Sequence, residues 1–474
     1  MIRLIRTWLL FIGVALVCAG CEPTNRLVWS PDGLRAVVLA SDGLRVCDQA
    51  GRISEPLIKA VDVACWTPDS THALAATRSK VHSWTEAAKL LSPPERKQAL
   101  NEAGKLREAI LSYSGSWDDF LKHNDPLLSS CRFTAEALLY LRENYPDQLK
   151  SKLKDRWGDI EKLDLDAWDV RSYELTAAGV AGGSSLYRTN RAVVDMRVAS
   201  HGKAALIVEQ ARPSDDDGRY QISAIPLEGG TARRITEQGA MFPDWSADGR
   251  SLVYMEAART DKDKAIPALG SLKVVAVCEA SGILRKDFGA ARTLAYVPFT
   301  GTGRIRCLNS GRIIFSSQEM ALPCAAADTT SLLTLFMLDP DRLATATRLV
   351  PRTAESDLDR SACWFEVSPD ETMVSIPRSS GRIAVLNVRT GDLMEVQPEV
   401  DPAWQSLPTI PQWRSSDELC FAAPTKKSPS DKWAFDLVVM NVNSKARQIL
   451  SKGWAPEAVS GFLRETNSAG LPSK

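Results

Sequence analysis

The sequence predicts an all-β protein, a seven-bladed β-propeller with a helical insertion in its second blade. A turn motif of the form Trp-Ser-Pro-Asp-Gly recurs along the chain, and an apolar strand follows each copy. Short strands at regular spacing, separated by turn residues, are typical of a closed all-β architecture. One interval between copies is much longer than the others and carries helical patterns, which predicts the insertion.

Composition excludes several classes of protein before any motif is considered. The chain has 474 residues, with 58 Lys and Arg against 58 Asp and Glu. No basic excess is present to neutralise a phosphate backbone, so we expect no nucleic-acid partner. A hydrophobic content of 44% and a charged content of 24% are ordinary for a globular protein, and exclude a disordered chain or a polytopic membrane protein.

Residues 1–20 have the features of a lipoprotein signal peptide. Arg3 and Arg6 precede an uncharged apolar stretch, residues 8–17, which is about half as long as a membrane-spanning helix. An Ala and a Gly then precede Cys21. This end resembles the lipobox of bacterial lipoproteins, in which the Cys is diacylated on sulfur, becomes the N-terminus by cleavage and is acylated again. The resemblance implies lipidation of Cys21, with palmitate among the chains.

The expected location is the cell envelope. Glu22, directly after the Cys, resembles the sorting pattern of lipoproteins in the Gram-negative outer membrane. Two or three acyl chains hold a protein firmly where one chain does not. We therefore expect an anchor in the outer membrane, on its periplasmic face. The alternative is an ordinary signal peptide with an incidental cysteine.

The propeller is predicted to occupy residues 21–84 and 168–463. In the turn motif, Pro presets φ, Asp bonds its own backbone and Gly accepts a positive φ, so the motif reverses the chain between an inner strand and a more apolar second strand. Third and fourth strands follow several copies. The seven copies begin at Trp29, Trp66, Val198, Trp245, Leu308, Val367 and Trp413.

The insertion is predicted to cover residues 85–167. Asp69 and His201 hold corresponding places in their turns but lie 132 positions apart, whereas 47 positions separate Asp370 from Asp417. The excess contains a capping box, Ser92-Pro93-Pro94-Glu95, followed by apolar residues at helical spacing. Residues 133–145 form a second amphipathic pattern, and Asp147 is expected to cap a third helix. The insertion is either a cap on one face of the propeller or a partner-docking module.

The C-terminal end supplies the last expectations about the fold. Residues 449 and 450 complete a fourth strand, and residues 454–463 form an apolar-dotted tail that we expect against the first blade. Residues 464–474 are polar and are expected to be a frayed terminus. The first and last blades must touch, because an open ring would expose two sheet edges.

The repeat, with its Trp-Ser-Pro-Asp-Gly-Lys core, resembles the TolB-type, WD40-like propeller repeat, most closely in the first, fourth and sixth copies. TolB itself carries an α/β domain ahead of its propeller, whereas here the first blade begins shortly after Cys21. The binding partners of TolB are therefore not expected for this chain. The same repeat occurs in relatives of prolyl oligopeptidase, which require a hydrolase domain that this sequence lacks.

Motifs that carry chemistry are scarce. The sequence has no Gly-x-Ser-x-Gly elbow and no phosphate loop, and residues 301–304 lack the third glycine of a dinucleotide fingerprint. The four histidines are scattered, and residues 215–218 lack the alternating ligands of a calcium loop. We expect no catalytic, cofactor-binding or metal-binding residues and no cofactor. The recurring tryptophans are interpreted as blade packing, with sugar stacking as the alternative.

Ten cysteines in an exported chain raise the question of disulfides. Cys18 and Cys21 belong to the signal region. Most of the others are interpreted as small buried strand residues. Cys307 and Cys324 fall in one blade and are the best candidates for a disulfide.

Two classes of function remain. The first is a lipid-anchored, non-enzymatic scaffold, monomeric, that binds a protein or peptide through the propeller and contacts the membrane only through its lipid. The alternative is an enzyme or a carbohydrate-binding protein whose site lies in the central funnel. Residues of such a site would be scattered over several blades, and a fold alone does not assign a function.

The lipid anchor has a direct test. Cys21→Ser removes the sulfur that would be acylated, so we expect the variant to leave the membrane fraction and to lose incorporation of labelled palmitate. Cys18→Ser is the matched control and should leave both unchanged. A Cys21→Ser protein that still sediments with membranes after a salt wash would contradict the anchor.

Overall fold

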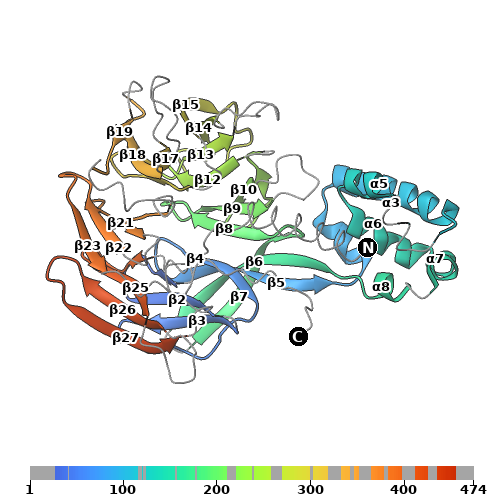
Figure 1. Cartoon of the computed structure of the whole chain (residues 1–474), viewed down its shortest axis with the longest axis horizontal. Coiled ribbons are helices and arrows are strands. Elements are labelled where there is room, and N and C mark those ends of the chain that lie inside the picture. Colours follow the sequence, from blue (N-terminus) through green and yellow to red (C-terminus); the bar gives the residue numbers. More distant parts are fainter. Residues whose placement is uncertain are drawn as a thin grey trace.

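The protein is a ring of antiparallel sheets with a helical lobe on one side (Figure 1). The structure is a computed structural model. It describes residues 27–454 except for 41, 116–119, 121–123, 155–156, 177–178, 211–219, 237–239, 258–268, 299–302, 319–332, 342–345, 352–363, 378–382, 398–410 and 425–434.

Strands that follow one another in the chain lie next to one another in each sheet. The inner strands are β1 (Leu27–Trp29), β4 (Val61–Trp66), β8 (Val193–Val198), β12 (Ala240–Trp245), β16 (Ile305–Cys307), β20 (Glu366–Val367) and β24 (Gln412–Trp413). The second strands are β2 (Arg35–Ala40), β5 (His72–Val81), β9 (Ala204–Gln210), β13 (Ser251–Ala257), β17 (Ile313–Gln318), β21 (Met373–Pro377) and β25 (Glu418–Pro424).

The outer half of each sheet continues the same order. The third strands are β3 (Gly43–Asp48), β6 (Leu165–Thr176), β10 (Tyr220–Pro226), β14 (Leu269–Ala276), β18 (Leu333–Leu338), β22 (Ile383–Asn387) and β26 (Phe435–Asn441). The fourth strands are β7 (Gly179–Thr189), β11 (Arg233–Arg234), β15 (Arg292–Pro298), β19 (Thr347–Arg348), β23 (Leu393–Gln397) and β27 (Arg447–Trp454). In the first sheet, isolated bridges from Leu44 to Ile58 and from Cys47 to Ile53 occupy the fourth place.

These strands make seven blades in the part of the chain that the structure describes. Five sheets correspond to one blade each, and an eight-stranded sheet contains two, β8–β11 and β12–β15. The two halves of that sheet are joined only by the pair Tyr220 and Ala240. The predicted all-β propeller is therefore confirmed, and the predicted second, third and fourth strands lie within a few residues of their expected positions.

The turn between the first two strands is held by side chains, as the motif predicts. In the first blade the Ser30 hydroxyl donates to the Asp32 carboxylate at 2.5 Å, and the Gly33 N–H donates to the Ser30 carbonyl at 2.8 Å. Gly33 has a φ of +68°, the left-handed region that glycine enters at little cost. Thr67, Ser246, Ser368 and Ser415 make the same side-chain bond to the Asp two residues later.

The tryptophans of the motif join neighbouring blades. The Trp66 indole donates to the Val28 carbonyl at 2.9 Å, and the Trp413 indole donates to the Glu366 carbonyl at 3.0 Å. Trp245 makes the same bond to Arg197 in the blade before it, at 3.0 Å. All three rings are buried. These contacts agree with the interpretation of the tryptophans as blade packing.

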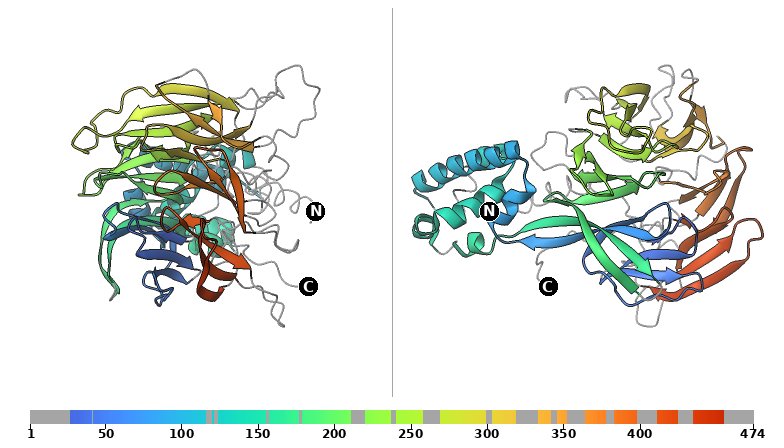
Figure 2. Two further views of the ribbon diagram at one scale, coloured as in Figure 1. Left: turned by 90° about the vertical axis from the view of Figure 1, so that its left-hand side faces the viewer. Right: turned by 180° about the vertical axis from the view of Figure 1, so that it is seen from behind.

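The first and last blades lie side by side and close the ring (Figure 2). Apolar residues from both blades share one buried cluster, which includes Cys47 from β3 and Cys420 from β25. The Arg414 guanidinium lies over the Trp29 ring, 5.1 Å from its centroid. A Cβ added to Gly33 would stand 2.5 Å from the Arg414 carbonyl oxygen, so only glycine fits this close approach. The expected closure is thus confirmed.

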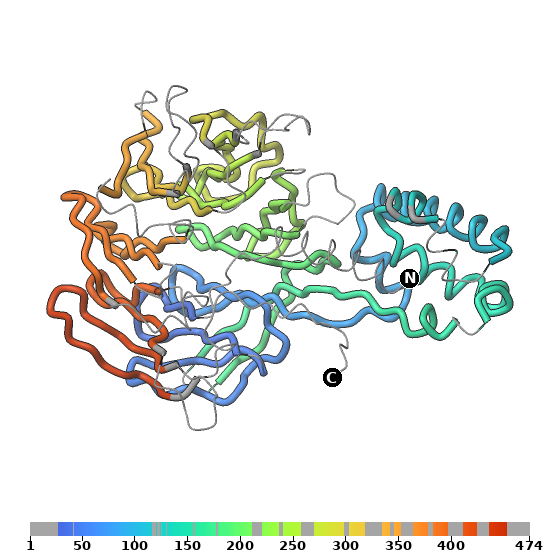
Figure 3. The backbone as a smooth tube through the Cα atoms, viewed as in Figure 1, coloured from blue at the N-terminus to red at the C-terminus, as the bar shows by residue number. Residues whose placement is uncertain are grey.

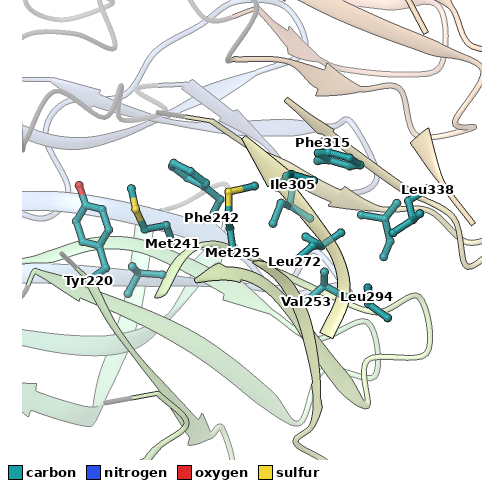
Figure 4. Close-up of a cluster of buried hydrophobic side chains, with 13 residues drawn as sticks. Tyr220, Met241, Phe242, Val253, Met255, Leu272, Leu294, Ile305, Phe315 and Leu338 are labelled. Atoms are coloured by element: carbon teal, nitrogen blue, oxygen red, sulfur yellow. The ribbon is translucent and has the colours of Figure 1, made fainter. Parts of the chain in front are cut away.

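Apolar side chains fill the space between adjacent blades. Figure 4 shows one such cluster, in which Met241, Phe242 and Met255 of the fourth blade face Ile305 and Phe315 of the fifth. Because each sheet buries both faces against its neighbours, second strands such as β2 and β9 carry almost continuous apolar runs.

The helical lobe is carried by the long ribbon of β5 and β6, the second and third strands of the second blade (Figure 3). The described helices are α2 (Trp84–Ala87), η1 (Ala88–Leu90), α3 (Pro93–Ser112), α5 (Asp125–Ser130), α6 (Thr134–Asn144), α7 (Pro146–Leu153) and α8 (Trp157–Glu161). They enclose a core of their own. Figure 1 shows the lobe beside the rim of the ring, so the expectation of a cap lying over one face is wrong.

Local details of the lobe follow the sequence closely. The capping box at Ser92 and Glu95 is present. The third helix begins at Pro146, so Asp147 lies in its first turn instead of capping it. The Glu95 carboxylate also lies 3.3 Å from Arg191, in the connection between β7 and β8, and this ion pair joins the lobe to the ring. The apolar tail predicted at residues 454–463 lies outside the described residues, apart from Trp454 at the end of β27.

Removing the lobe should leave a folded propeller. Val81 and Leu165 are opposite each other where the ribbon meets the lobe, so an Asn-Gly turn can replace residues 82–164. We expect the far-UV circular dichroism to lose its helical component while the melt stays cooperative. The free energy of unfolding should fall by about 3 kcal/mol or less, since the lobe has its own core and Arg191 loses one partner. An insoluble or non-cooperative product would show that the lobe completes the ring.

Candidate functional site in the central channel

A cavity of about 440 Å³ lies at the centre of the ring. Residues from the inner strands of six blades line it, with the fourth blade as the exception. Small-molecule sites occupy about 300–1,000 Å³ and bring a few polar groups together among apolar walls. The central channel therefore has the size and position of a ligand site.

Strand periodicity explains which residues reach the channel. Successive side chains of a strand point to opposite sides, so positions two apart share one side. The residue before the Trp position of the turn motif occupies the same place in every inner strand. These seven residues are Val28, Cys65, Arg197, Asp244, Arg306, Glu366 and Gln412. In the fifth blade the Gly311 N–H donates to the Leu308 carbonyl, as Gly33 does to Ser30 in the first. The fifth copy of the motif therefore begins at Cys307, one residue earlier than predicted. The side of the ring formed by the third to sixth blades is charged, and the remaining side is neutral.

The four charged residues of this set alternate in sign around the ring. The Arg197 guanidinium lies 2.9 Å from the Asp244 carboxylate, and Arg306 lies 3.6 Å from the same carboxylate. Arg306 then reaches Glu366 at 2.9 Å, and the Gln412 amide donates to Glu366 at 3.3 Å. This alternating set, Arg197, Asp244, Arg306 and Glu366, is called the charge chain below. It connects four consecutive blades, the third to the sixth, through side chains alone, and Gln412 adds the seventh.

Two further charged residues stand two positions earlier in their strands. Asp195 lies 3.0 Å from Arg197, and Arg304 pairs with Glu366. The Arg304 side chain is only 5% exposed. Burial lowers the pKa of Arg304 although Glu366 opposes that shift. Burial also disfavours the charge of Arg197, but Asp195 and Asp244 outweigh it and raise the pKa of Arg197.

The wall of the cavity carries more positive than negative charge. Four arginines line it, Arg197, Arg304, Arg306 and Arg414, together with two carboxylates, Asp195 and Glu366. Aromatic rings of Trp66, Trp364 and Trp413 form part of the apolar wall. Such a wall can hold an anionic group and stabilise negative charge that develops on a bound molecule.

None of the residues considered from the sequence as candidate lipid, calcium or metal sites is among the described residues that line the cavity. Cys21 and residues 215–218 are outside the described part of the chain. His201 is a turn residue whose Nδ1 accepts the Lys203 N–H at 3.1 Å, as predicted. Arg304 is the last of residues 301–304, which lack the third glycine of a dinucleotide fingerprint. Its position relative to the turn motif, shared with Asp195, was the signal that could have identified it.

The cysteines do not supply a nucleophile in the described residues. Cys307 is recorded as a free thiol. The predicted disulfide partner, Cys324, lies outside the described residues. Burial raises the pKa of Cys47 and of Cys278 to about 11, which keeps both as thiols at neutral pH. Within the same part of the chain, no three His, Cys, Asp or Glu side chains are placed to bind a metal ion together.

None of the described helices is both long and apolar enough to cross a membrane.

No protein-family model matches the sequence, and no curated protein matches it either. Among solved structures, a puromycin hydrolase matches 92% of this chain and 55% of its own, at 13% identity and a TM-score of 0.49. The propeller domain of the Trilobed protease from Pyrococcus furiosus, described as having an open velcro topology, matches 88% and 93%, at 7% identity and 0.47. An oligogalacturonate lyase matches 60% and 71%, at 11% identity and 0.42.

These likenesses concern the propeller fold, and the chain spans about half the length of the puromycin hydrolase. The expectation of a non-enzymatic scaffold is nevertheless wrong against these comparisons, because the similar structures include peptidases and a lyase. The prediction of a TolB-like propeller is supported, and a putative TolB from Agrobacterium tumefaciens is also found, matching 62% and 83% at 14% identity and a TM-score of 0.28.

The charge chain should be essential for stability. Asp244→Ala removes the carboxylate shared by Arg197, Arg306 and the Cys307 N–H, which it accepts at 2.8 Å, and leaves buried charge without a partner. We expect a loss of about 3–5 kcal/mol in the free energy of unfolding, measured by urea denaturation. Asp166→Ala, which breaks a surface pair with Lys80, should cost about 1 kcal/mol or less. Equal losses in the two variants would contradict a structural role for the chain.

Proposed function

We propose that the protein is an enzyme that acts on a small polar molecule bound in the central channel. The observation that carries this proposal is the cavity, where charged side chains from separate blades converge. Its volume of about 440 Å³ suits a molecule of a few sugar or amino-acid units and is too small for a folded partner.

The lining offers two kinds of chemical group. Asp195 is the more accessible of the two lining carboxylates, with 35% of its side chain exposed against 9% for Glu366. Asp195 is thus the group placed to exchange a proton with a bound substrate. Arg197, held by Asp195 and Asp244, can stabilise negative charge beside it. An acid or base next to a fixed cation is the combination that this proposal assigns to the channel.

A blocked channel tests the proposal. Val28→Trp enlarges a side chain that lines the cavity, whereas Leu34→Trp adds the same ring to an exposed position of the same blade. The probes are trigalacturonate, trialanine and maltotriose, followed by calorimetry for binding and by mass spectrometry for turnover. We expect Val28→Trp to weaken binding of any active probe by about tenfold or more and to reduce its turnover in parallel.

Leu34→Trp should leave binding and turnover unchanged, and melting temperatures of both variants should confirm that they fold. If both variants bind and convert the probes as the unmodified protein does, the site is not in the channel. If no probe binds, the proposal of a small-molecule site fails for these substrate classes.

We also propose that acylation of Cys21 places this propeller at the envelope membrane. The support is the sequence alone, the small residues before Cys21 and the apolar stretch ahead of them. A periplasmic position would give the channel access to small molecules that enter the envelope.

A further inference from the structure

We infer that the ligand of the channel carries a carboxylate, and that Arg304 is the residue that anchors it. This inference rests on the proposed function and names its substrate class. It comes from the concentration of arginines in the cavity wall and from the incomplete hydrogen bonding of two of them.

A ligand in the cavity meets the charged side chains that line it, which are not the same set as the charge chain. The complete network has three arginines and three carboxylates, Asp195, Asp244 and Glu366. Asp244 does not line the cavity, whereas Arg414 does. The lining residues alone are four arginines and two carboxylates, but Asp244 pairs with Arg197 from behind the wall and Glu418 pairs with Arg414 at 3.6 Å. An anion is therefore favoured by arginine donors in the wall that lack an acceptor among the described residues, not by a net charge.

Arg304 has the least complete pairing of these arginines. Its side chain is 5% exposed, and its Nε–H has no acceptor among the described residues. Its carboxylate partner is Glu366, which also receives Arg306 and Gln412. A buried guanidinium with five donors and one shared carboxylate is stabilised by a second acceptor. The lowered pKa of Arg304, caused by burial, agrees with this.

Arg306 has donor capacity left as well. It lies 2.9 Å from Glu366 but 3.6 Å from Asp244, and the second distance is longer than a hydrogen bond. A ligand carboxylate beside Arg304 and Arg306 would take the bidentate geometry that arginine favours. The buried position, rather than a surface one, makes such a contact strong because water does not compete for it.

A carboxylate of this kind has two sources, a uronic acid in an oligosaccharide and the C-terminus of a short peptide. Paired probes separate charge from shape. Trigalacturonate is compared with its methyl ester, and trialanine with trialanine amide, by calorimetry at two salt concentrations. We expect one pair to bind with the acid at least about tenfold tighter than its neutral twin, because a hydrogen bond to a charged group is worth a factor of about 10 to 100.

Three variants assign the preference to residues. Arg304→Gln should reduce the preference for the acid over its neutral twin to about threefold or less, because the acid loses its charged partner. Glu366→Gln removes the competing carboxylate, so the acid should bind about three- to tenfold tighter. Arg285→Gln, which breaks an exposed pair with Glu279, is the control and should change neither. Should either variant fail to fold, the comparison of acid and neutral twin on the unmodified protein still decides whether the ligand needs a carboxylate.

The outcomes distinguish the two proposals. An acid preference that Arg304→Gln removes, or that Glu366→Gln increases, supports the inference, and the pair that shows it identifies the source of the carboxylate. Equal binding of acids and neutral twins, or a preference that Arg304→Gln leaves intact while Glu366→Gln adds nothing, overturns the inference and leaves the channel as a small-molecule site. No binding by any probe, neutral or acidic, counts against the proposed function itself.

Discussion

Carboxylates shared between arginines of neighbouring blades hold the centre of the ring. Asp244 serves two blades besides its own, and Glu366 receives side chains from the fifth and seventh. Buried charges of this kind are costly to desolvate, and they are stable only when every partner is in place. The positions of the inner strands are therefore coupled, and the cavity keeps its shape because the charges around it allow one arrangement. The apolar layers farther out supply most of the buried surface but are less specific about position.

The propeller fold could be predicted from the sequence because each blade repeats the same turn motif followed by an apolar strand. The Ser-x-Asp turn fixes where an inner strand ends and a second strand begins, and the apolar run after it predicts burial on both faces. The helical insertion could also be predicted, from the long interval after Asp69 and from the capping box at Ser92. The position of the lobe beside the rim could not, since it depends on the length of β5 and β6 and on contacts such as Glu95 with Arg191.

The site was much harder to predict. Inner strands such as β20 and β24 are two residues long, so they show no apolar alternation that would mark a channel-facing side. Arg197, Asp244, Arg306 and Glu366 are isolated polar residues in four different repeats, and only their common place before the turn connects them. A search for linear motifs cannot find such a set, because its members become neighbours only when the ring closes. Aligning the seven repeats, with the fifth copy starting at Cys307 instead of Leu308, and comparing that one column would have found it.

The closing contact between Gly33 and the Arg414 carbonyl also bears on how such a ring can change in evolution. Each blade is made from one continuous stretch of chain, so duplication of a repeat would add a blade without breaking any existing one. An added blade at this junction would separate the two backbones, and the Arg414 guanidinium would lose the Trp29 ring beneath it. An added blade among the third to sixth would instead interrupt the alternation of charge and leave two like charges adjacent. The number of repeats is thus restricted at both places. Close backbone packing restricts it at the junction of the first and last blades, and the alternation of positive and negative side chains restricts it in the third to sixth blades.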